Sequence, residues 1–257
     1  MNQDTRRIYL IKKLLQENPQ YENIRIPQNR DEQKLLLRAL FNVRPPRKIS
    51  PTFRLIEDLY LREENSEKGI VDLQNLSRKI IIWQGDITRL KIDAIVNAAN
   101  SGLTGCYIPN HNCIDNTIHT YAGIELRNAC AEIMTEQGYP EPTGQAKITS
   151  AYNLPSKYVI HTVGPIVENG IPTEEQKQLL ASSYQQSLEL AVKYHLKTIA
   201  FPCISTGIFH FPNDLAAQIA VKTVKKFMAE NNSIEKVIFN VFKEKDKAIY
   251  EQLLQQN

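Results

Sequence analysis

The stretch "TIAFPCISTGIFHFPNDLAAQIAVKTVKKF", residues 198–227, decides the fold class. It opens with apolar β-forming residues, crosses a short loop and ends in an amphipathic run that begins near Pro212. This order predicts a strand, a loop and a helix. In α/β sheets, ligands bind at loops that leave the carboxyl ends of strands. Ser205, Thr206 and Gly207 could turn backbone N–H groups and hydroxyls towards a phosphate, and a simple turn is the alternative.

The same two kinds of segment alternate from about Lys79 onwards. The predicted strands are 79–84, 94–98, 146–152, 158–163, 198–204 and 236–242. The predicted helices are 114–134, 174–195, 212–230 and 245–255. The strands are rich in Val and Ile with little alternation, which is typical of a sheet that is covered on both faces. The sequence therefore predicts a three-layer α/β domain.

The chain before about residue 75 has a different pattern. Apolar residues recur at three- and four-residue spacing in 4–16 and 30–43, and again in 52–73, which predicts helices. The segment "RPPRKISP", residues 44–51, interrupts them because proline cannot continue a helix. We predict a helical N-terminal extension, residues 1–75, that packs on a main domain, residues 76–257. The extension contains no recognisable catalytic constellation.

The composition and charge of the chain indicate an ordinary globular protein. Of the residues, 42% are hydrophobic and 23% are charged, which suits a globular chain with a large core. A net charge of +3 fits anionic ligands but is too small to argue for nucleic acid. The start lacks a signal-peptide core and no apolar run reaches eighteen residues, so we expect a cytoplasmic protein without membrane contact. Cysteines stay reduced in that compartment.

Two further loops carry polar residues at predicted strand ends. In "WQGDITRL", Gly85 permits a tight turn or a close ligand approach, with the Asp86 carboxylate beside it. A plain Gly-Asp turn is the alternative. In "IVNAANSGLTG", the amides of Asn97 and Asn100 could read a sugar hydroxyl, because an amide both donates and accepts hydrogen bonds. Asn97 could equally be a buried structural amide, so Asn100 is the better candidate.

The loop "GCYIPNHNCID", residues 105–115, concentrates soft ligands in Cys106, His111 and Cys113. Two thiolates and an imidazole suit Zn²⁺, and three protein ligands leave a fourth position open, as in catalytic sites. Zinc there could orient a substrate, polarise an oxygen or lower the pKa of water. A chance gathering on a loop is the alternative. Asp115 follows in the predicted first turn of a helix, where the helix dipole favours a carboxylate.

Other histidines and cysteines are expected to be structural. His119 falls inside a predicted helix and His161 on a predicted strand, where packing or a satisfied hydrogen bond is the simpler role. Cys130 and Cys203 are expected to be buried reduced thiols, which behave as small hydrophobic side chains.

Five motifs occur together in a fixed order. They are "GDITRLKIDAIVNAANSGL", "IDNTIHTYAG", "GQAKIT", "YVIHTVGP" and "ISTGIFHFP". In combination they resemble the macrodomain family, α/β modules that bind ADP-ribose and often hydrolyse it from proteins. The resemblance covers roughly residues 79–256. It implies a three-layer α/β/α macrodomain with a mixed central sheet.

The resemblance also implies roles for individual residues. Asp86 would accept a hydrogen bond from the adenine amino group, with Ile87 beside it and Phe242 packed on the ring. The diphosphate loop and the aromatic residue near the distal ribose would be Ser205, Thr206, Gly207, Ile208 and Phe209. Asn100 and Asp115 match the pair beside the distal ribose in the hydrolytic branch, where the carboxylate could activate water or position the 2″-hydroxyl.

The sequence departs from most hydrolytic relatives between these two residues. There "TGCYIPNHNCID" replaces a glycine-rich loop. This looks like the zinc-containing macrodomain subgroup of microbes, which also carries a helical N-terminal extension. It implies one Zn²⁺ per chain on Cys106, His111 and Cys113. The subgroup is associated with removing ADP-ribose from a lipoyl-carrier protein, similar to the glycine-cleavage H protein, that a partner sirtuin has modified.

The sequence thus predicts a zinc-dependent hydrolase that removes mono-ADP-ribose from a modified protein. One alternative is a non-catalytic ADP-ribose reader, which would need neither Asn100, Asp115 nor an open metal site. Another is an esterase that acts on free O-acyl-ADP-ribose in the same pocket. Neither nucleic acid nor a membrane is expected as a partner.

Overall fold

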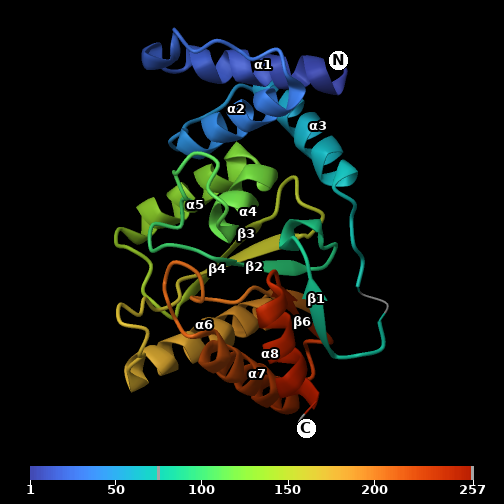
Figure 1. The fold of residues 1–257 in the computed structure, drawn as a ribbon, viewed down its shortest axis with the longest axis vertical. Helices are drawn as coiled ribbons and strands as arrows, with labels where there is room; N and C mark the ends of the chain where they lie inside the picture. Colours follow the sequence, from blue (N-terminus) through green and yellow to red (C-terminus); the bar gives the residue numbers. More distant parts are fainter. Residues whose placement is uncertain (74–75, 256–257) are drawn as a thin grey trace.

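A six-stranded mixed sheet forms the centre of the protein (Figure 1). The computed structural model describes residues 1–73 and 76–255. The strands are β1 (Ile80–Gln84), β2 (Ala94–Ala98), β3 (Ala146–Ser150), β4 (Tyr158–Thr162), β5 (Thr198–Phe201) and β6 (Lys236–Val241). Their order is β1-β6-β5-β2-β4-β3. Only β3 runs antiparallel to its neighbour, and the other paired strands are parallel.

Helices cover both faces of this sheet, and three of the helices precede it in the chain. They are α1 (Gln3–Gln16), α2 (Arg30–Val43), α3 (Pro51–Glu67), α4 (Ile114–Ala122), α5 (Ile124–Gln137), α6 (Glu174–Lys193), α7 (Asn213–Glu230) and α8 (Glu244–Gln255). Two short 3₁₀ helices are η1 (Pro19–Tyr21) and η2 (Ile87–Arg89). In Figure 1, α4 and α5 lie on one face of the sheet and α6, α7 and α8 on the other, while α1–α3 form a further layer beyond α4 and α5. The predicted fold class is confirmed.

Each central strand supplies apolar side chains to both faces. In β2, Val96 packs in the core beneath α6 and α7, whereas Ile95 packs in the core beneath α4 and α5. In β6, Phe239 packs in the core beneath α6 and α7, and Ile238 packs in the core beneath α4 and α5. Because both faces are buried, these strands need apolar residues at every position, which explains their lack of alternation.

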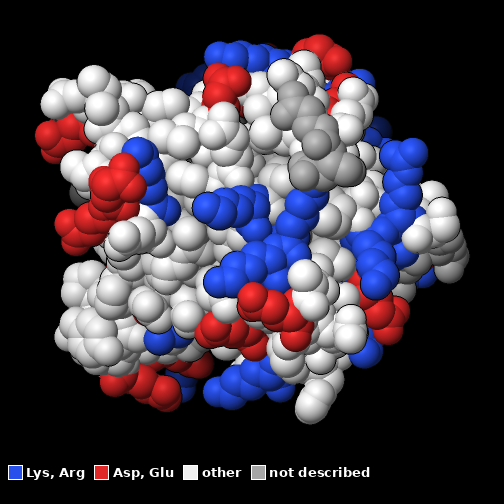
Figure 2. Space-filling model, turned by 90° about the horizontal axis from the view of Figure 1, so that it is seen from below, with Lys and Arg blue, Asp and Glu red and all other residues white. Residues whose placement is uncertain are grey.

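The surface beyond α6–α8 is of mixed charge. Viewed from that side, Lys and Arg side chains lie close to Asp and Glu side chains (Figure 2). No helix of the described part of the chain combines the length and apolarity needed to cross a membrane.

The N-terminal helices have a core of their own. It contains buried residues of all three helices, such as Leu10, Leu37 and Tyr60, and it includes Ile124 at the start of α5. Asn2, Asn29 and Ser50 cap the three helices through side-chain oxygens that accept backbone N–H bonds. The extension therefore packs directly onto the main domain. The predicted boundary after residue 75 falls outside the described residues.

The prediction of one helix over residues 114–134 is wrong. The structure has two helices, α4 and α5, separated at Gly123. Gly123 has φ of 99°, a conformation that favours glycine. A carboxyl oxygen of Glu57 in α3 accepts the Ile124 N–H at 2.9 Å and so caps α5. The break depends on a partner 67 residues away, which a local apolar pattern does not reveal.

The other differences are at segment ends. α3 ends at Glu67 rather than continuing to residue 73, and Gly69 follows with φ of 81°. Val71 instead forms a bridge with Leu90. The third, fourth, fifth and sixth predicted strands end one to three residues earlier than expected.

Glu57 gives a prediction for the pH dependence of stability. Burial raises the pKa of its carboxyl from 4.5 to about 8. Between these values the folded state holds a proton that the unfolded state has lost, so stability falls as pH rises. The decline attributable to Glu57 is up to about 1.4 kcal/mol per pH unit. Glu57→Gln keeps an oxygen that can accept the Ile124 N–H but does not titrate, so its free energy of unfolding should depend less on pH. Urea unfolding of both proteins at pH 5.5, 6.5 and 7.5 measures this difference, and equal slopes would contradict it.

Candidate functional site

The predicted binding residues lie at one edge of the sheet. The loops after β1, β2 and β5 and the residue after β6 all leave the carboxyl ends of parallel strands. Hydrogen bonds join the first and last of these: Gly85 N–H donates to Val241 O at 3.0 Å, and the side-chain Nδ2 of Asn240 donates to Gly85 O at 2.8 Å. Gln84 Nε2 also donates to Phe242 O at 3.3 Å. Asp86 and Phe242 are therefore held at the same end of the sheet.

Asp86 is fixed by hydrogen bonds on both oxygens. Its Oδ1 accepts from the Thr88 backbone N–H at 3.0 Å and from the Thr88 hydroxyl at 2.6 Å. Its Oδ2 lies 2.6 Å from the ammonium of Lys68, which follows α3. Burial alone would raise the pKa of Asp86, but Lys68 and Thr88 outweigh it and hold the pKa below its usual value. The carboxylate therefore stays ionised as a hydrogen-bond acceptor.

Two residues predicted beside adenine differ in exposure. The Phe242 side chain is 75% exposed, so its ring is open to a stacking partner. Ile87 is only 3% exposed and packs in the core beneath α4 and α5. The Ile87 side chain is thus unavailable to a ligand. Its backbone N–H donates to no acceptor within the described residues, so a contact of Ile87 with a ligand would be through its backbone.

The loop after β5 folds back on itself before α7. Phe211 N–H donates to Ser205 O at 3.0 Å, and His210 N–H donates to Gly207 O at 3.1 Å. Ser205 has φ of 64°, and its buried hydroxyl has no partner among the described residues. The backbone N–H groups of Gly207, Ile208 and Phe209 also have no acceptor among the described residues. Consecutive free N–H groups suit an anion.

The loop also offers side chains at its exposed edge. Ile208 is 66% exposed, whereas Phe209 is half-buried. The Thr206 hydroxyl donates to Cys203 O at 2.9 Å, so it stabilises the turn in addition to any ligand contact. The loop can therefore be both a turn and a phosphate site, because the Thr206 side chain stabilises the turn while three backbone N–H groups stay free.

Asn100 and Asp115 are in direct contact. Asp115 lies in the first turn of α4, where its Oδ2 accepts from Asn100 Nδ2 at 3.2 Å. Its Oδ1 accepts from Asn97 Nδ2 at 2.8 Å. Burial raises the pKa of Asp115 to about 6, although the Asn97 bond opposes this. Asn97 itself is fully buried, so it positions the carboxylate rather than facing solvent.

Cys106, His111 and Cys113 come together on the loop before α4. Their ligand atoms all lie within 4.8 Å of one another, and all three residues are half-buried. Cys106 Sγ is 3.5 Å from His111 Nδ1. Cys113 also caps α4, because its Sγ accepts the Asn116 N–H at 3.4 Å. Two sulfur atoms and one imidazole at these separations fit a tetrahedral zinc ion with one position left open.

A second group that could hold a metal ion lies beneath the first. His119, Cys130 and His161 are buried, and their ligand atoms also lie within 4.8 Å of one another. His161 Nδ1 is 3.2 Å from Asn97 Nδ2, and its Nε2 is 3.0 Å from the Thr149 hydroxyl. Both His161 nitrogens therefore have protein partners. The two nitrogens of His119 have no hydrogen-bond partner in the described chain, although Nε2 lies 3.5 Å from Asp115 Oδ1. Because these three residues come from α4, α5 and β4, their spacing in the sequence does not indicate the group.

Comparison with known proteins gives the family. The macro domain model matches residues 96–220. A protein-ADP-ribose hydrolase of Treponema medium is 55% identical over 261 residues, covering 99% of this chain and 100% of the relative. A protein-ADP-ribose hydrolase of Staphylococcus aureus is 46% identical over 248 residues, covering 95% of this chain and 93% of the relative.

Solved structures agree with this match. A Trypanosoma brucei macrodomain in complex with ADP-ribose has a TM-score of 0.64 at 30% identity, covering 81% of this chain and 92% of that one. An Oceanobacillus iheyensis macrodomain with ADP has a TM-score of 0.62 at 40% identity, covering 68% of this chain and 89% of that one. Sequence identity that extends over nearly the whole chain, together with the shared fold, shows that this protein belongs to the macrodomain family.

Proposed function

We propose that this protein is a zinc-dependent hydrolase that removes mono-ADP-ribose from a modified protein. The observation that carries the proposal is the contact of Asp115 with Asn97 and Asn100, two residues along the chain from the metal ligand Cys113. A protein that only bound ADP-ribose would need no buried, hydrogen-bonded carboxylate at this place. Two relatives described as protein-ADP-ribose hydrolases match 99% and 95% of this chain.

The adenosine end of the ligand would bind between the first and last strands. Asp86 accepts a hydrogen bond from the adenine amino group, the Ile87 backbone lies beside the ring, and Phe242 packs on it. The free N–H groups of the loop after β5 bind the diphosphate, and Phe209 approaches the distal ribose. The loop residues in this assignment are Ser205, Thr206, Gly207, Ile208 and Phe209.

The scissile end would lie between Asp115 and the three metal ligands. A carboxyl with a pKa of about 6 is mostly ionised at pH 7, so Asp115 can accept a proton from water or hold the 2″-hydroxyl. Asn100 orients the ribose through its amide. Cys106, His111 and Cys113 would hold one Zn²⁺, which when bound supplies Lewis-acid polarisation of a substrate oxygen and orientation of the ribose.

The substrate we propose is a lipoyl-carrier protein, similar to the glycine-cleavage H protein, modified by a partner sirtuin. The support is the family resemblance of the metal loop and of the extension, residues 1–75, before the macrodomain, residues 76–257. All four cysteines are unpaired, which suits action in the reducing cytoplasm.

Three substrates separate this proposal from its alternatives. Release of ADP-ribose should be fastest from a modified lipoyl-carrier protein, slower from other mono-ADP-ribosylated proteins, and slower still from free O-acyl-ADP-ribose. Faster turnover of the free ester would make the protein an esterase. Tight binding without release from any of the three would make it a reader.

Asp86→Ala should weaken ADP-ribose binding by roughly ten- to hundredfold, because losing a hydrogen bond to a charged group costs about 1.5–3 kcal/mol. Isothermal titration calorimetry with free ADP-ribose measures the change. Asp31→Ala, at an exposed acid in the first turn of α2, is the control and should bind as the wild type does. Unchanged affinity in Asp86→Ala would place the adenine site elsewhere.

A further inference from the structure

The loop that carries the metal ligands is covered on its outer side by helix α2 of the N-terminal extension. Arg38 in α2 donates from Nη2 to the backbone carbonyl of His111 at 2.9 Å and to Asn116 Oδ1 at 3.0 Å. These bonds span 73 and 78 residues of sequence. The extension is thus in direct contact with one of the metal ligands.

Asn116, which accepts the bond from Arg38, also bonds to other residues of the loop. It is fully buried, and its Nδ2 donates to Cys106 O at 3.3 Å and to Ile108 O at 3.0 Å. Its backbone N–H donates to Cys113 Sγ. Asn116 therefore bonds to Cys106 through its side-chain amide and to Cys113 through its backbone N–H. Arg38 bonds both to the Asn116 side-chain amide and to the backbone carbonyl of the third ligand, His111.

Asn42, one turn further along α2, makes a second set of bonds. Its Oδ1 accepts the Asn110 N–H at 2.9 Å, and its Nδ2 donates to the Thr120 hydroxyl at 2.9 Å. Asn110 has φ of 54°, so the loop next to His111 adopts a left-handed turn. The bond to Asn42 compensates for the cost of that conformation.

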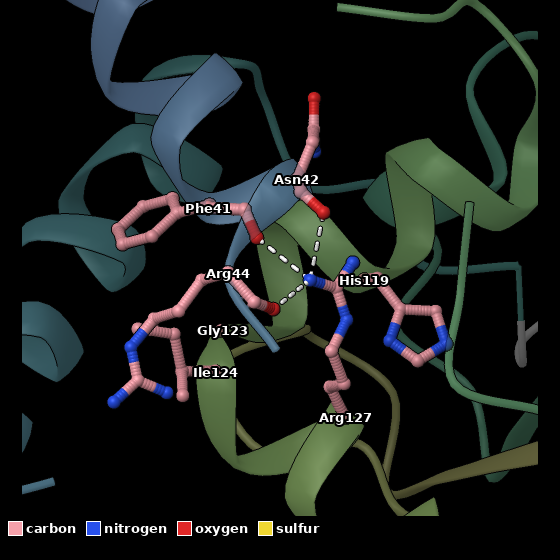
Figure 3. Close-up of a pocket in the computed structure, with 7 residues that line it drawn as sticks. All are labelled: Phe41, Asn42, Arg44, His119, Gly123, Ile124 and Arg127. Carbon is pink, nitrogen blue, oxygen red and sulfur yellow. Dashed lines mark hydrogen bonds between the residues drawn. The ribbon is translucent and has the colours of Figure 1, made fainter. Parts of the chain in front are cut away.

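Arg127 joins the end of α2 to the start of the loop. Its Nη1 donates to the carbonyls of Phe41, Asn42 and Arg44, which surround the guanidinium in Figure 3. Its Nε donates to Thr104 O at 2.7 Å, and its guanidinium carbon lies 4.3 Å from the centre of the Tyr107 ring. The buried guanidinium therefore fixes the position of α2 relative to the loop.

These contacts matter because the loop itself has no regular structure. Residues between β2 and α4 form turns and bends only. Ordering one residue of such backbone costs about 1–2 kcal/mol, so a loop that must be ordered by the metal would bind the metal less tightly. Removing partners that orient metal ligands typically lowers metal affinity by about ten- to hundredfold.

We propose that Arg38 is a positioning residue for the metal centre, so that the N-terminal extension supplies part of its outer shell. This rests on the proposed function, in which Cys106, His111 and Cys113 bind zinc. The extension then has a role in zinc affinity, although it contributes no ligand of its own.

The test is zinc affinity in the full-length protein, measured by chelator competition. Arg38→Met keeps most of the side-chain stem but removes both bonds, and it should weaken zinc binding by about ten- to hundredfold. Lys34→Met is the matched control, one helical turn earlier on α2. Lys34 pairs with Glu64 at 2.8 Å and, among the described residues, has no hydrogen bond or ion pair with the loop. The control should bind zinc within about twofold of the wild type. ADP-ribose affinity, which depends mainly on other loops, should change by less than about threefold in either variant.

Two further variants guard against a loss of folding. Arg38→Lys keeps the charge but lacks the planar guanidinium, so it should give an intermediate zinc affinity. Asn42→Ala removes the acceptor for Asn110 N–H and should also weaken zinc binding. Thermal unfolding of the zinc-free proteins checks that each variant is native at the temperature of the titration.

The outcomes separate this inference from the proposed metal site. Native Arg38→Met and Asn42→Ala that bind zinc as tightly as the wild type would overturn the role of the extension while leaving the metal site intact. A wild type that does not bind zinc would overturn both. A fall in stability with unchanged zinc affinity would make Arg38 a structural residue only.

Discussion

Asp115→Ala is expected to lower the rate of ADP-ribose release by about a hundredfold or more, because it removes a group that positions or activates a reacting atom. The affinity for free ADP-ribose should change far less, since the proposed adenine and diphosphate sites are on other loops. The comparison pairs a single-turnover release assay on a mono-ADP-ribosylated protein with a calorimetric titration of ADP-ribose.

Glu132→Ala is the control for this experiment. Glu132 is an exposed acid on α5, and its loss should leave both rate and affinity unchanged. Equal losses of rate and affinity in Asp115→Ala would show that Asp115 contributes to binding or folding. Catalysis would then depend on Asn100 and the metal.

Cys113→Ala should lose the metal. We expect about one zinc per wild-type chain by elemental analysis, because two thiolates and an imidazole favour Zn²⁺, and far less in the variant. Hydrolysis should fall with the metal content.

Cys113 also caps α4, so the alanine variant alone would confuse two effects. Cys113→Ser separates them, because a serine hydroxyl is a good helix cap but a poor zinc ligand. Both variants should lose zinc, whereas only the alanine variant should lose about 1 kcal/mol of stability from the missing cap. Zinc that persists in both but disappears in Cys130→Ala would place the metal in the buried group of His119, Cys130 and His161.

The sequence was sufficient to predict all six strands and most of the helices. Buried strands without alternation and amphipathic helices have local patterns, and α2 begins and ends as predicted, at Arg30 and Val43. The motif order placed Asp86 and Asn100 on loops and Asp115 in the first turn of a helix, and the structure brings Asn100 and Asp115 into contact. The proposed metal ligands Cys106, His111 and Cys113 were recognisable because they lie within eight residues of one another.

The missed features depend on contacts between distant residues. The break at Gly123 requires a cap from Glu57, and Asp86 is paired with Lys68, which belongs to the extension. From the sequence, Asn97 could be either a ligand contact or a structural amide. Only the fold shows which, because it places the Asn97 side chain beside Asp115. The bonds of Arg38 to the metal loop cross more than 70 residues, and helical periodicity alone does not indicate them.

Zinc-dependent release of ADP-ribose from a protein can be tested in a single experiment. Mono-ADP-ribosylated lipoyl-carrier protein is incubated with an excess of enzyme, so that each substrate molecule is turned over once. One sample contains enzyme that has been stripped of metal, and the other contains the same enzyme after one equivalent of zinc is restored. Mass spectrometry follows the loss of ADP-ribose from the carrier. We expect little release by the stripped enzyme and recovery of the native rate with zinc. Full release by enzyme that elemental analysis shows to be free of metal would contradict it.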